Sequence, residues 1–226
     1  MKGEKMSATK PDTTNSIYNL TVTLLYMKPA VWRRLYVPGN TTLADFHVIL
    51  QVAMGWYNCH LYEFTYREAT YGEPDPEEGW LDAVDDARRI TLAKLLPAAG
   101  VSLRYRYDFG DNWEHQIRVN GIVPPSPGVH YPRCVAGKRA CPPEDCGGPW
   151  GYGNLLDRLQ QPDAAVHDRH RVDPDAFDLS EVNERLNPQF LAEMRRQIDP
   201  DLVQCAARDH CDFEQDLPLH GHMKRP

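Results

Sequence analysis

Residues 101–120 read Val101-Ser-Leu-Arg-Tyr-Arg-Tyr-Asp-Phe-Gly-Asp-Asn-Trp-Glu-His-Gln-Ile-Arg-Val-Asn120, and this pattern indicates a β-hairpin. Apolar and polar side chains alternate on both sides of Phe109-Gly-Asp-Asn112, which supplies residues that favour a turn. In the second strand His115 shares a face with Trp113 and Ile117, because side chains alternate between the two faces of a sheet. The sequence therefore predicts an antiparallel hairpin with His115 on its apolar side.

More strands and a helix are expected before this hairpin. Tyr18–Tyr26 alternates apolar with polar residues, and Val31–Val37 and His60–Tyr66 have the composition of strands. Thr42-Leu-Ala-Asp45 resembles a capping box, in which the Thr side chain accepts a hydrogen bond from the third helical residue. The apolar residues that follow fall on one helical face up to Gly55, a typical helix end.

Short helices are expected later in the chain, over Thr91–Leu96, Leu155–Leu159, Asp178–Leu186 and Pro188–Ile198. We therefore predict an α+β fold: an antiparallel sheet with one main amphipathic helix, a Cys/Pro-rich loop and a helical C-terminal third. The expected domain covers residues 17–198, between a disordered leader over residues 1–16 and a mobile tail over residues 199–226.

Composition narrows the class of protein. The net charge of −7 disfavours direct nucleic-acid binding, because neutralising phosphates requires a basic face. The polar N-terminus lacks the apolar core of a signal peptide, and no apolar run approaches membrane-spanning length. We expect a cytoplasmic protein with reduced thiols and a protein partner, and no association with a membrane.

The cysteine segment, Tyr131–Tyr152, is a candidate metal site. It places Cys134, Cys141 and Cys146 among prolines and glycines that favour turns. Clustered cysteines in a chain without a secretory signal indicate metal binding before they indicate disulfides. The alternative is that these cysteines are small apolar side chains that pack in a Pro-rich turn.

Zinc is the expected ion, because thiolates and imidazole are its usual protein ligands and four are needed. His130 is the nearest candidate for the fourth ligand, while His115 and Asp145 are alternatives. We expect the zinc to be structural, since a loop with little regular structure gains its fold from binding an ion.

A second cluster, Asp108, Asp111 and His115, has the side chains of a hydrolytic metal site or of an acid–base pair. The competing interpretation is structural. Asp in a hairpin turn accepts local backbone N–H groups, and a histidine among apolar neighbours is usually enclosed. For the same reason His60 is interpreted as a core residue among the aromatic side chains of its strand.

Several motifs together resemble the plasmid pRiA4b ORF-3 family, whose members include passenger proteins of mobile elements. The motifs occur in the family's order and are Val31-Trp-Arg-Arg34, Ala53-Met-Gly-Trp56, His60-Leu-Tyr-Glu-Phe64, Tyr71-Gly-Glu-Pro-Asp75, Tyr107–His115, Tyr131–Tyr152, Asp175–Leu179 and Val182-Asn183. Tyr62 is a departure, because the family often has histidine at this position. The resemblance implies an α+β fold and assigns no chemistry.

Two functions from different classes are compatible with these residues. The first is a non-catalytic binding or interaction module, accessory to a mobile element or its host, that uses aromatic and arginine side chains. The alternative is a metal-dependent hydrolase or nuclease that uses Asp108, Asp111 and His115. A third hypothesis, direct DNA binding, requires one shared face for the arginines Arg33, Arg34, Arg104, Arg106 and Arg118.

Overall fold

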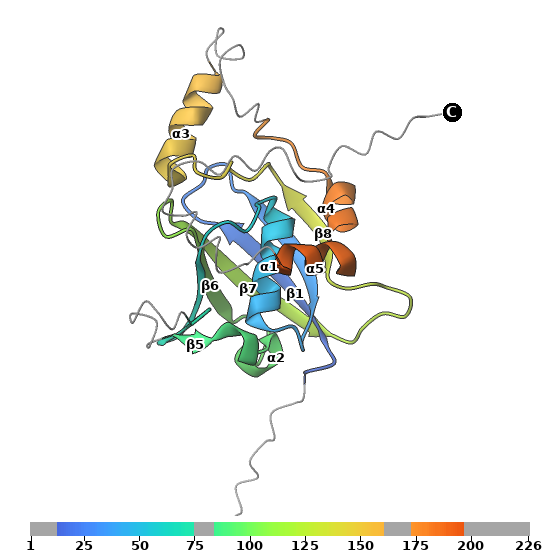
Figure 1. Ribbon diagram of the computed structural model, residues 1–226. Helices are drawn as coiled ribbons and strands as arrows, with labels where there is room; N and C mark the ends of the chain where they lie inside the picture. Colours follow the sequence, from blue (N-terminus) through green and yellow to red (C-terminus); the bar gives the residue numbers. More distant parts are fainter. Residues whose placement is uncertain (1–12, 75–83, 161–172, 197–226) are drawn as a thin grey trace, which may run out of the picture.

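The computed structural model describes residues 13–74, 84–160 and 173–196, which form a mixed β-sheet with helices packed against it (Figure 1). Its strands are β1 (Ile17–Leu24), β2 (Trp32–Pro38), β3 (Tyr62–Tyr66), β4 (Ala69–Gly72), β5 (Asp85–Asp86), β6 (Ser102–Tyr107), β7 (Trp113–Val123) and β8 (Arg133–Lys138). In space they follow the order β5-β4-β3-β6-β7-β1-β2-β8. Among the described strands all neighbours are antiparallel except β4 and β5. The predicted α+β fold is confirmed.

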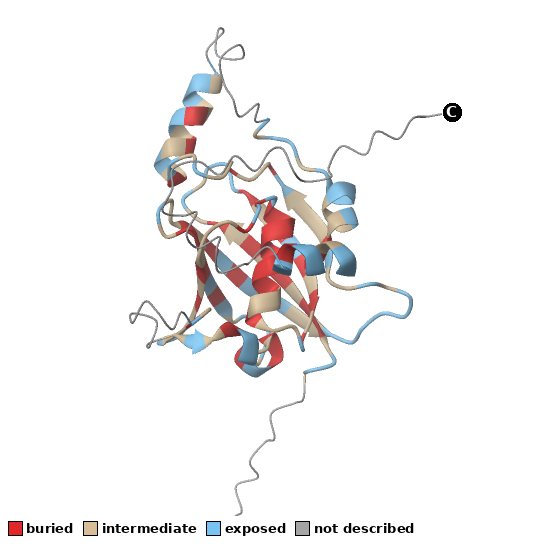
Figure 2. Cartoon of the chain, in the orientation of Figure 1, coloured by how far each residue is buried: buried red, intermediate tan, exposed pale blue. Residues whose placement is uncertain are grey.

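The helices are α1 (Leu43–Met54), α2 (Leu92–Leu95), α3 (Gly148–Leu159), α4 (Leu179–Arg185) and α5 (Pro188–Arg196), with a 3-10 turn η2 (Ala87–Arg89). Helix α1 crosses one face of the sheet, α4 and α5 lie against α1, and α3 extends from one end of the molecule (Figure 1). Covered on both sides, α1 is buried along most of its length (Figure 2). The core therefore lies between α1 and this face of the sheet.

Helix α1 begins and ends where its sequence predicts. The Thr42 side chain accepts a hydrogen bond from the Asp45 backbone N–H at 3.0 Å. Gly55 closes the helix with φ 103°, a left-handed conformation that glycine adopts without steric cost. The Gly55 N–H donates to the Gln51 carbonyl at 2.8 Å, which satisfies one of the last carbonyl groups of the helix.

The predicted hairpin is formed by β6 and β7, in which Tyr107 pairs with Trp113. Its turn places Asp108 and Asn112 at φ 56°, a conformation that Asp and Asn tolerate better than most residues. His115 is fully buried as expected, and its Nδ1 donates to the Trp113 carbonyl at 3.0 Å. The strands alternate buried and exposed residues (Figure 2), so one face of the hairpin belongs to the core.

Two elements differ from the prediction in ways that affect the functional site. Strand β3 begins at Tyr62, so His60 lies in the loop before the strand. The cysteine segment is not a continuous loop, because it supplies edge strand β8 and the start of α3. Strand β8 pairs with β2 across a β-bulge.

Arg33 points into the core, although its neighbour Arg34 is exposed. Its Nε donates to the Ala53 carbonyl at the end of α1 at 2.8 Å, and its Nη1 donates to the Lys138 carbonyl of β8 at 3.1 Å. The guanidinium also lies over the Phe177 ring, 4.4 Å from the ring centroid. This buried cation therefore joins α1 to the edge of the sheet.

Most of the predicted leader and all of the predicted tail lie outside the described residues, so these predictions stay untested. In the parts of the chain that the structure describes, no helix combines the length and the apolar character needed to cross a membrane.

Candidate metal centre

Three segments that are distant in the sequence meet at one end of the sheet. They are the loop between α1 and β3, the turn between β6 and β7, and the part of the cysteine segment between β8 and α3. Each contributes acidic or imidazole side chains to one cluster, which consists of His60, Asp108, Glu144 and Asp145.

A buried polar network fixes the first segment, the loop after α1. The Tyr105 hydroxyl lies 2.8 Å from Nδ1 of His47 and accepts a hydrogen bond from Gln51 Nε2 at 2.9 Å. Gln51 also accepts from the Asn58 N–H at 3.0 Å, and the Asn58 side chain accepts from His47 Nε2. Asn58 is held in a left-handed conformation with φ 62°, which directs the next residues toward the cluster.

Direct hydrogen bonds attach the cysteine segment to this loop. The Trp56 indole N–H donates to the Pro142 carbonyl at 2.9 Å. Oε1 of Glu144 accepts from the Tyr57 N–H and from the Tyr107 hydroxyl, both at 3.0 Å. These contacts leave the other carboxylate oxygen of Glu144, Oε2, facing the cluster.

The turn of the hairpin is held in a similar way. Oδ1 of Asp108 accepts from the N–H groups of Gly110 at 2.8 Å and Asp111 at 3.2 Å, as expected for Asp in a turn. Oδ2 of Asp111 accepts from the Gly147 N–H at 3.1 Å, which joins the turn to the start of α3. Asp108 therefore uses one oxygen for the turn and presents Oδ2 to the cluster.

His60 Nε2 is the centre of the cluster. It lies 3.1 Å from Oδ1 of Asp145, 3.7 Å from Oδ2 of Asp108 and 4.0 Å from Oε2 of Glu144. The side chains of His60, Asp108 and Glu144 are 14%, 8% and 11% exposed, whereas that of Asp145 is 57% exposed. The cluster is thus buried on one side and open to solvent at Asp145.

Two buried atoms of the cluster make no hydrogen bond within the described residues, namely Nε2 of His60 and Oε2 of Glu144. The 3.1 Å approach of Asp145 to His60 is an ion-pair distance without hydrogen-bond geometry. Burial raises the pKa of Glu144 to about 7, because a buried carboxylate loses its hydration. Buried polar atoms are nearly always satisfied, so a water molecule or an ion is the expected partner of these two atoms.

The three distances from His60 Nε2 lie in the range spanned by ligand atoms around one metal ion. Bonds of about 2.0–2.2 Å place neighbouring ligand atoms roughly 3.0–3.6 Å apart and opposite ones about 4.2 Å apart. The ligand atoms of His60, Asp108 and Asp145 all lie within 4.8 Å of one another, and so do those of Cys59, His60 and Glu144. His60 belongs to both sets. Within the described residues no single set contains Glu144 together with Asp108 and Asp145, so all four side chains would bind one ion only after a side-chain rotation.

The cysteines of the predicted zinc site fall outside both sets, although Cys141 and Cys146 lie near Glu144. Cys134 is buried in β8, where its Sγ contacts the Ala136 carbonyl at 3.4 Å. Cys134 and Cys141 both lie near the Arg33 guanidinium, whose positive charge partly offsets the rise in their pKa on burial. Within the described residues, neither set of potential ligands contains Cys134, Cys141, Cys146 or His130. As zinc ligands these four residues stay a prediction.

Asp108, Asp111 and His115 do not form a common set of ligand atoms within the described part of the chain. Asp108 and Asp111 accept backbone N–H groups, and His115 is enclosed, with its pKa lowered to about 3 by burial. These are the features expected of the structural interpretation. Of the three residues, Asp108 reaches the cluster.

Sequence reasoning did not identify His60 and Glu144 as members of this cluster. His60 was assigned to a strand, and a strand places it among core aromatics rather than in a loop. Glu144 stands beside Asp145, which the sequence did offer as a ligand, between Pro143 and Cys146. An acidic pair inside a cysteine- and proline-rich segment was the available signal.

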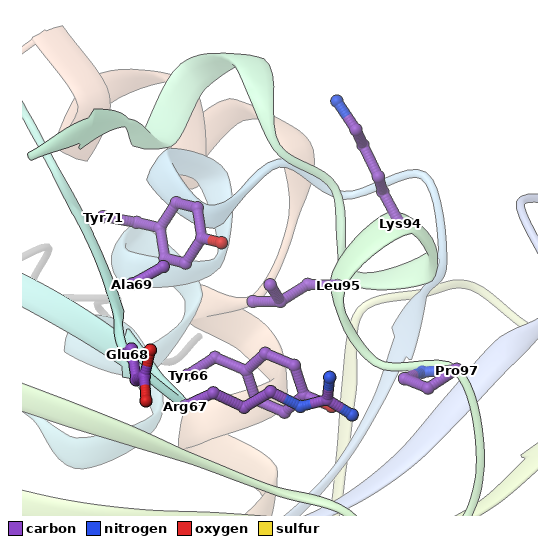
Figure 3. Close-up of a pocket in the computed structure, with 8 residues that line it drawn as sticks. All are labelled: Tyr66, Arg67, Glu68, Ala69, Tyr71, Lys94, Leu95 and Pro97. Carbon is purple, nitrogen blue, oxygen red and sulfur yellow. The ribbon is translucent and has the colours of Figure 1, made fainter.

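A separate pocket of about 520 Å³ lies near the other end of β3 (Figure 3). Tyr66 lines it from the end of β3, Arg67 from the turn that follows, and Leu95 from α2. The Arg67 guanidinium lies over the Tyr66 ring, 5.2 Å from its centroid. The lining contains a single acidic side chain, Glu68, so it does not provide a set of metal ligands.

Comparison with known proteins places this chain in a family. A family model described as plasmid pRiA4b ORF-3-like protein matches residues 16–185, which include all four residues of the cluster. The uncharacterized protein y4hQ of Sinorhizobium fredii (strain NBRC 101917 / NGR234) is 44% identical over 156 residues, which are 69% of this chain and 77% of that protein.

A similar solved structure is the protein of unknown function MM3350 from Methanosarcina mazei Go1. It superposes with a TM-score of 0.65 at 32% identity and covers 74% of this chain and 97% of its own. The resemblance found in the sequence motifs is confirmed, and the chain belongs to the plasmid pRiA4b ORF-3-like family.

Proposed function

We propose that this protein is a non-catalytic binding module in which one divalent metal ion, bound by His60, Asp108, Glu144 and Asp145, holds three loops together. The observation that carries the proposal is the set of three carboxylate oxygens within 3.1–4.0 Å of His60 Nε2. A cation would satisfy the unpaired atoms of His60 and Glu144 and would offset the repulsion among the acids.

A structural role for the ion follows from where its ligands lie. They come from three connecting segments rather than from one helix or strand, so an ion would crosslink loops that have little regular structure. The proposed ion is structural, as the sequence predicts for the cysteine segment. Its ligands from that segment are Glu144 and Asp145 instead of the cysteine thiols.

Zinc is the ion that we favour. Imidazole and carboxylate suit several divalent metals, but Cys59 Sγ lies within 4.8 Å of the ligand atoms of His60 and Glu144 and is a candidate for a further ligand. A thiolate favours zinc over magnesium, calcium and manganese, which prefer oxygen ligands. The family description refers to a plasmid, and on this basis the proposed role of the binding module is accessory to a mobile element or its host.

Elemental analysis of protein purified without a metal-affinity tag tests the proposal. We expect about one zinc ion per chain in the wild type and a loss of more than half of it in His60→Ala and Glu144→Gln, since each removes one of about four ligands. His130→Ala is the matched control, because it removes a histidine outside the cluster. Cys141→Ser/Cys146→Ser is expected to retain zinc.

Two results would contradict the proposal. One is wild-type protein that contains no metal and is not stabilised by added zinc. The other is zinc that survives His60→Ala but is lost in Cys141→Ser/Cys146→Ser, which would place the ion among the thiols instead.

A metal-dependent hydrolase is the second candidate, and the exposure of Asp145 favours it. An ion at the cluster would be reached from solvent on the side of this 57% exposed carboxylate, where a water molecule could be its ligand. Hydrolysis of a chromogenic phosphodiester by zinc-loaded wild-type protein, but not by Glu144→Gln, would favour the hydrolase over the binding module.

A further inference from the structure

The face of the sheet opposite α1 is open to solvent over β6, β7, β1 and β2. Their inward side chains form the core, and the outward ones alternate with them and are exposed or partly exposed (Figure 2). We call the outward positions of these four strands the outer face. The outer face is polar and carries arginines on β2, β6 and β7.

Strand register places two of these arginines on either side of one residue. Thr21 of β1 pairs with Arg34 of β2 and with Arg118 of β7. Directly paired residues share a face and neighbouring strands lie about 4.8 Å apart, so the two arginines stand roughly 10 Å apart on the outer face. Both side chains are exposed, and neither has an acidic partner within the described residues.

The other arginines of the outer face are neutralised. Arg104 pairs with Glu114 at 2.7 Å, and Arg106 pairs with Glu63 at 2.9 Å. On these four strands the unpaired positive charge therefore lies at Arg34 and Arg118, and the exposed Lys138 and Arg133 of β8 stand beside Trp32 and Tyr36, although the whole chain carries a net charge of −7. A negatively charged ligand would find its complement over β2, β1 and β7.

Aromatic rings flank this charge on β2. Trp32 and Tyr36 stand two positions before and after Arg34, so all three side chains share the outer face, and both rings are partly exposed. The Tyr36 hydroxyl accepts a hydrogen bond from Asn19 at 3.3 Å, which helps to fix its position. Strand β2 thus presents an aromatic, a guanidinium and a second aromatic group in a row.

We infer that the outer face around Arg34 and Arg118 binds single-stranded nucleic acid. The guanidinium groups would contact phosphates, while unpaired bases stack on Trp32 and Tyr36, which is how open sheets bind single strands. A duplex fits poorly, because its bases are stacked inside and a broad sheet does not enter the major groove. The inference rests on the proposal of a binding module and adds its surface and its partner.

Fluorescence anisotropy with labelled oligonucleotides tests this inference, with single-stranded RNA, single-stranded DNA and duplex DNA as probes at low salt. The wild type should bind one or both single strands more tightly than the duplex. Arg34→Gln/Arg118→Gln should reduce the slope of log affinity against log salt by about 1.4, since each phosphate contact contributes roughly 0.7. Trp32→Ala should weaken binding about fivefold or more.

Arg158→Gln is the matched control, because Arg158 is an exposed arginine on α3, away from the outer face. It should bind like the wild type. Preference for RNA or for DNA would identify the kind of strand. No binding at low salt, tighter binding of the duplex, or wild-type affinity in Arg34→Gln/Arg118→Gln would overturn the inference.

The zinc content of the same preparations separates this inference from the metal proposal. Zinc at the cluster without binding of single strands would overturn the inference alone. Binding of single strands by metal-free protein that zinc does not stabilise would support the outer face and contradict the metal site.

Discussion

His60 owes its position to its neighbours rather than to its own chemistry. Asn58, which lies two residues before His60, is hydrogen-bonded to His47 and Gln51. The Trp56 indole N–H donates to the Pro142 carbonyl. These contacts are buried, so the loop has little freedom to turn His60 away from the acids. The ligands of the proposed ion are therefore largely preorganised, which lowers the entropy lost on binding.

His115 provides a prediction at the same scale, because burial lowers its pKa from 6.5 to about 3. The unfolded chain takes up a proton on this residue below pH 6.5 while the folded protein does not, so stability is present above pH 6.5 and is lost as the pH falls toward 3. The loss approaches about 1.4 kcal/mol per pH unit for one such group.

His115→Gln should therefore flatten the fall in unfolding free energy between pH 6 and pH 4 by about that slope. Urea unfolding at several pH values measures it. The raised pKa of Glu144 acts in the opposite direction but equally in both proteins, so it cancels in the comparison. Parallel curves for the variant and the wild type would show that His115 is charged in the folded protein.

At the scale of elements, helix α1 and the hairpin of β6 and β7 were predictable because their signals are local. Periodicity, the Thr42 cap and the terminal Gly55 all lie within one short stretch of chain. Strand β8 was not predictable in this way. Its sequence, Arg133-Cys-Val-Ala-Gly-Lys138, lacks a clear alternation, and it becomes a strand by pairing with distant β2.

The candidate site was predicted only in part, because some of its residues are positioned by contacts between segments that are distant in the sequence. Asp108 and Asp145 were recognised as possible ligands from residue type and turn context. His60 and Glu144 were not, since their approach depends on where β3 begins and on how the cysteine segment folds back over the α1 loop. Neither fact is encoded within a few residues.

The junction of the cysteine segment with α3 yields a prediction about element packing. Gly148 has φ 65°, and a Cβ placed there would lie 2.4 Å from the Asp111 carbonyl oxygen. Gly148→Ala should destabilise the protein by about 1–3 kcal/mol through backbone strain and displacement of α3. Urea unfolding provides the measurement.

Gly153→Ala is the matched control in the same helix. A Cβ at Gly153 meets no atom within 4 Å, and alanine favours helix, so this change should stabilise by roughly 0.5–1 kcal/mol. Opposite signs for the two variants are the expected result. Equal effects would mean that α3 does not dock on the turn through Gly148.

At the scale of the whole molecule, the two proposed functional regions lie on different parts of one sheet. The acidic cluster occupies the end where the loops after α1 and β6 meet the cysteine segment, and the unpaired arginines lie on the face opposite α1. The net charge of −7 therefore conceals a separation of charge, with an acidic cluster and unpaired arginines on the same domain. Composition alone could not reveal this separation.

Anomalous X-ray scattering at the zinc absorption edge tests the central claim most directly, with crystals of untagged protein grown with zinc. We predict one strong peak bonded to His60 Nε2 and to carboxylate oxygens of Asp108, Glu144 and Asp145, at about 2.0–2.2 Å. A peak bonded instead to the sulfurs of Cys134, Cys141 and Cys146, or no peak within reach of His60, would contradict it.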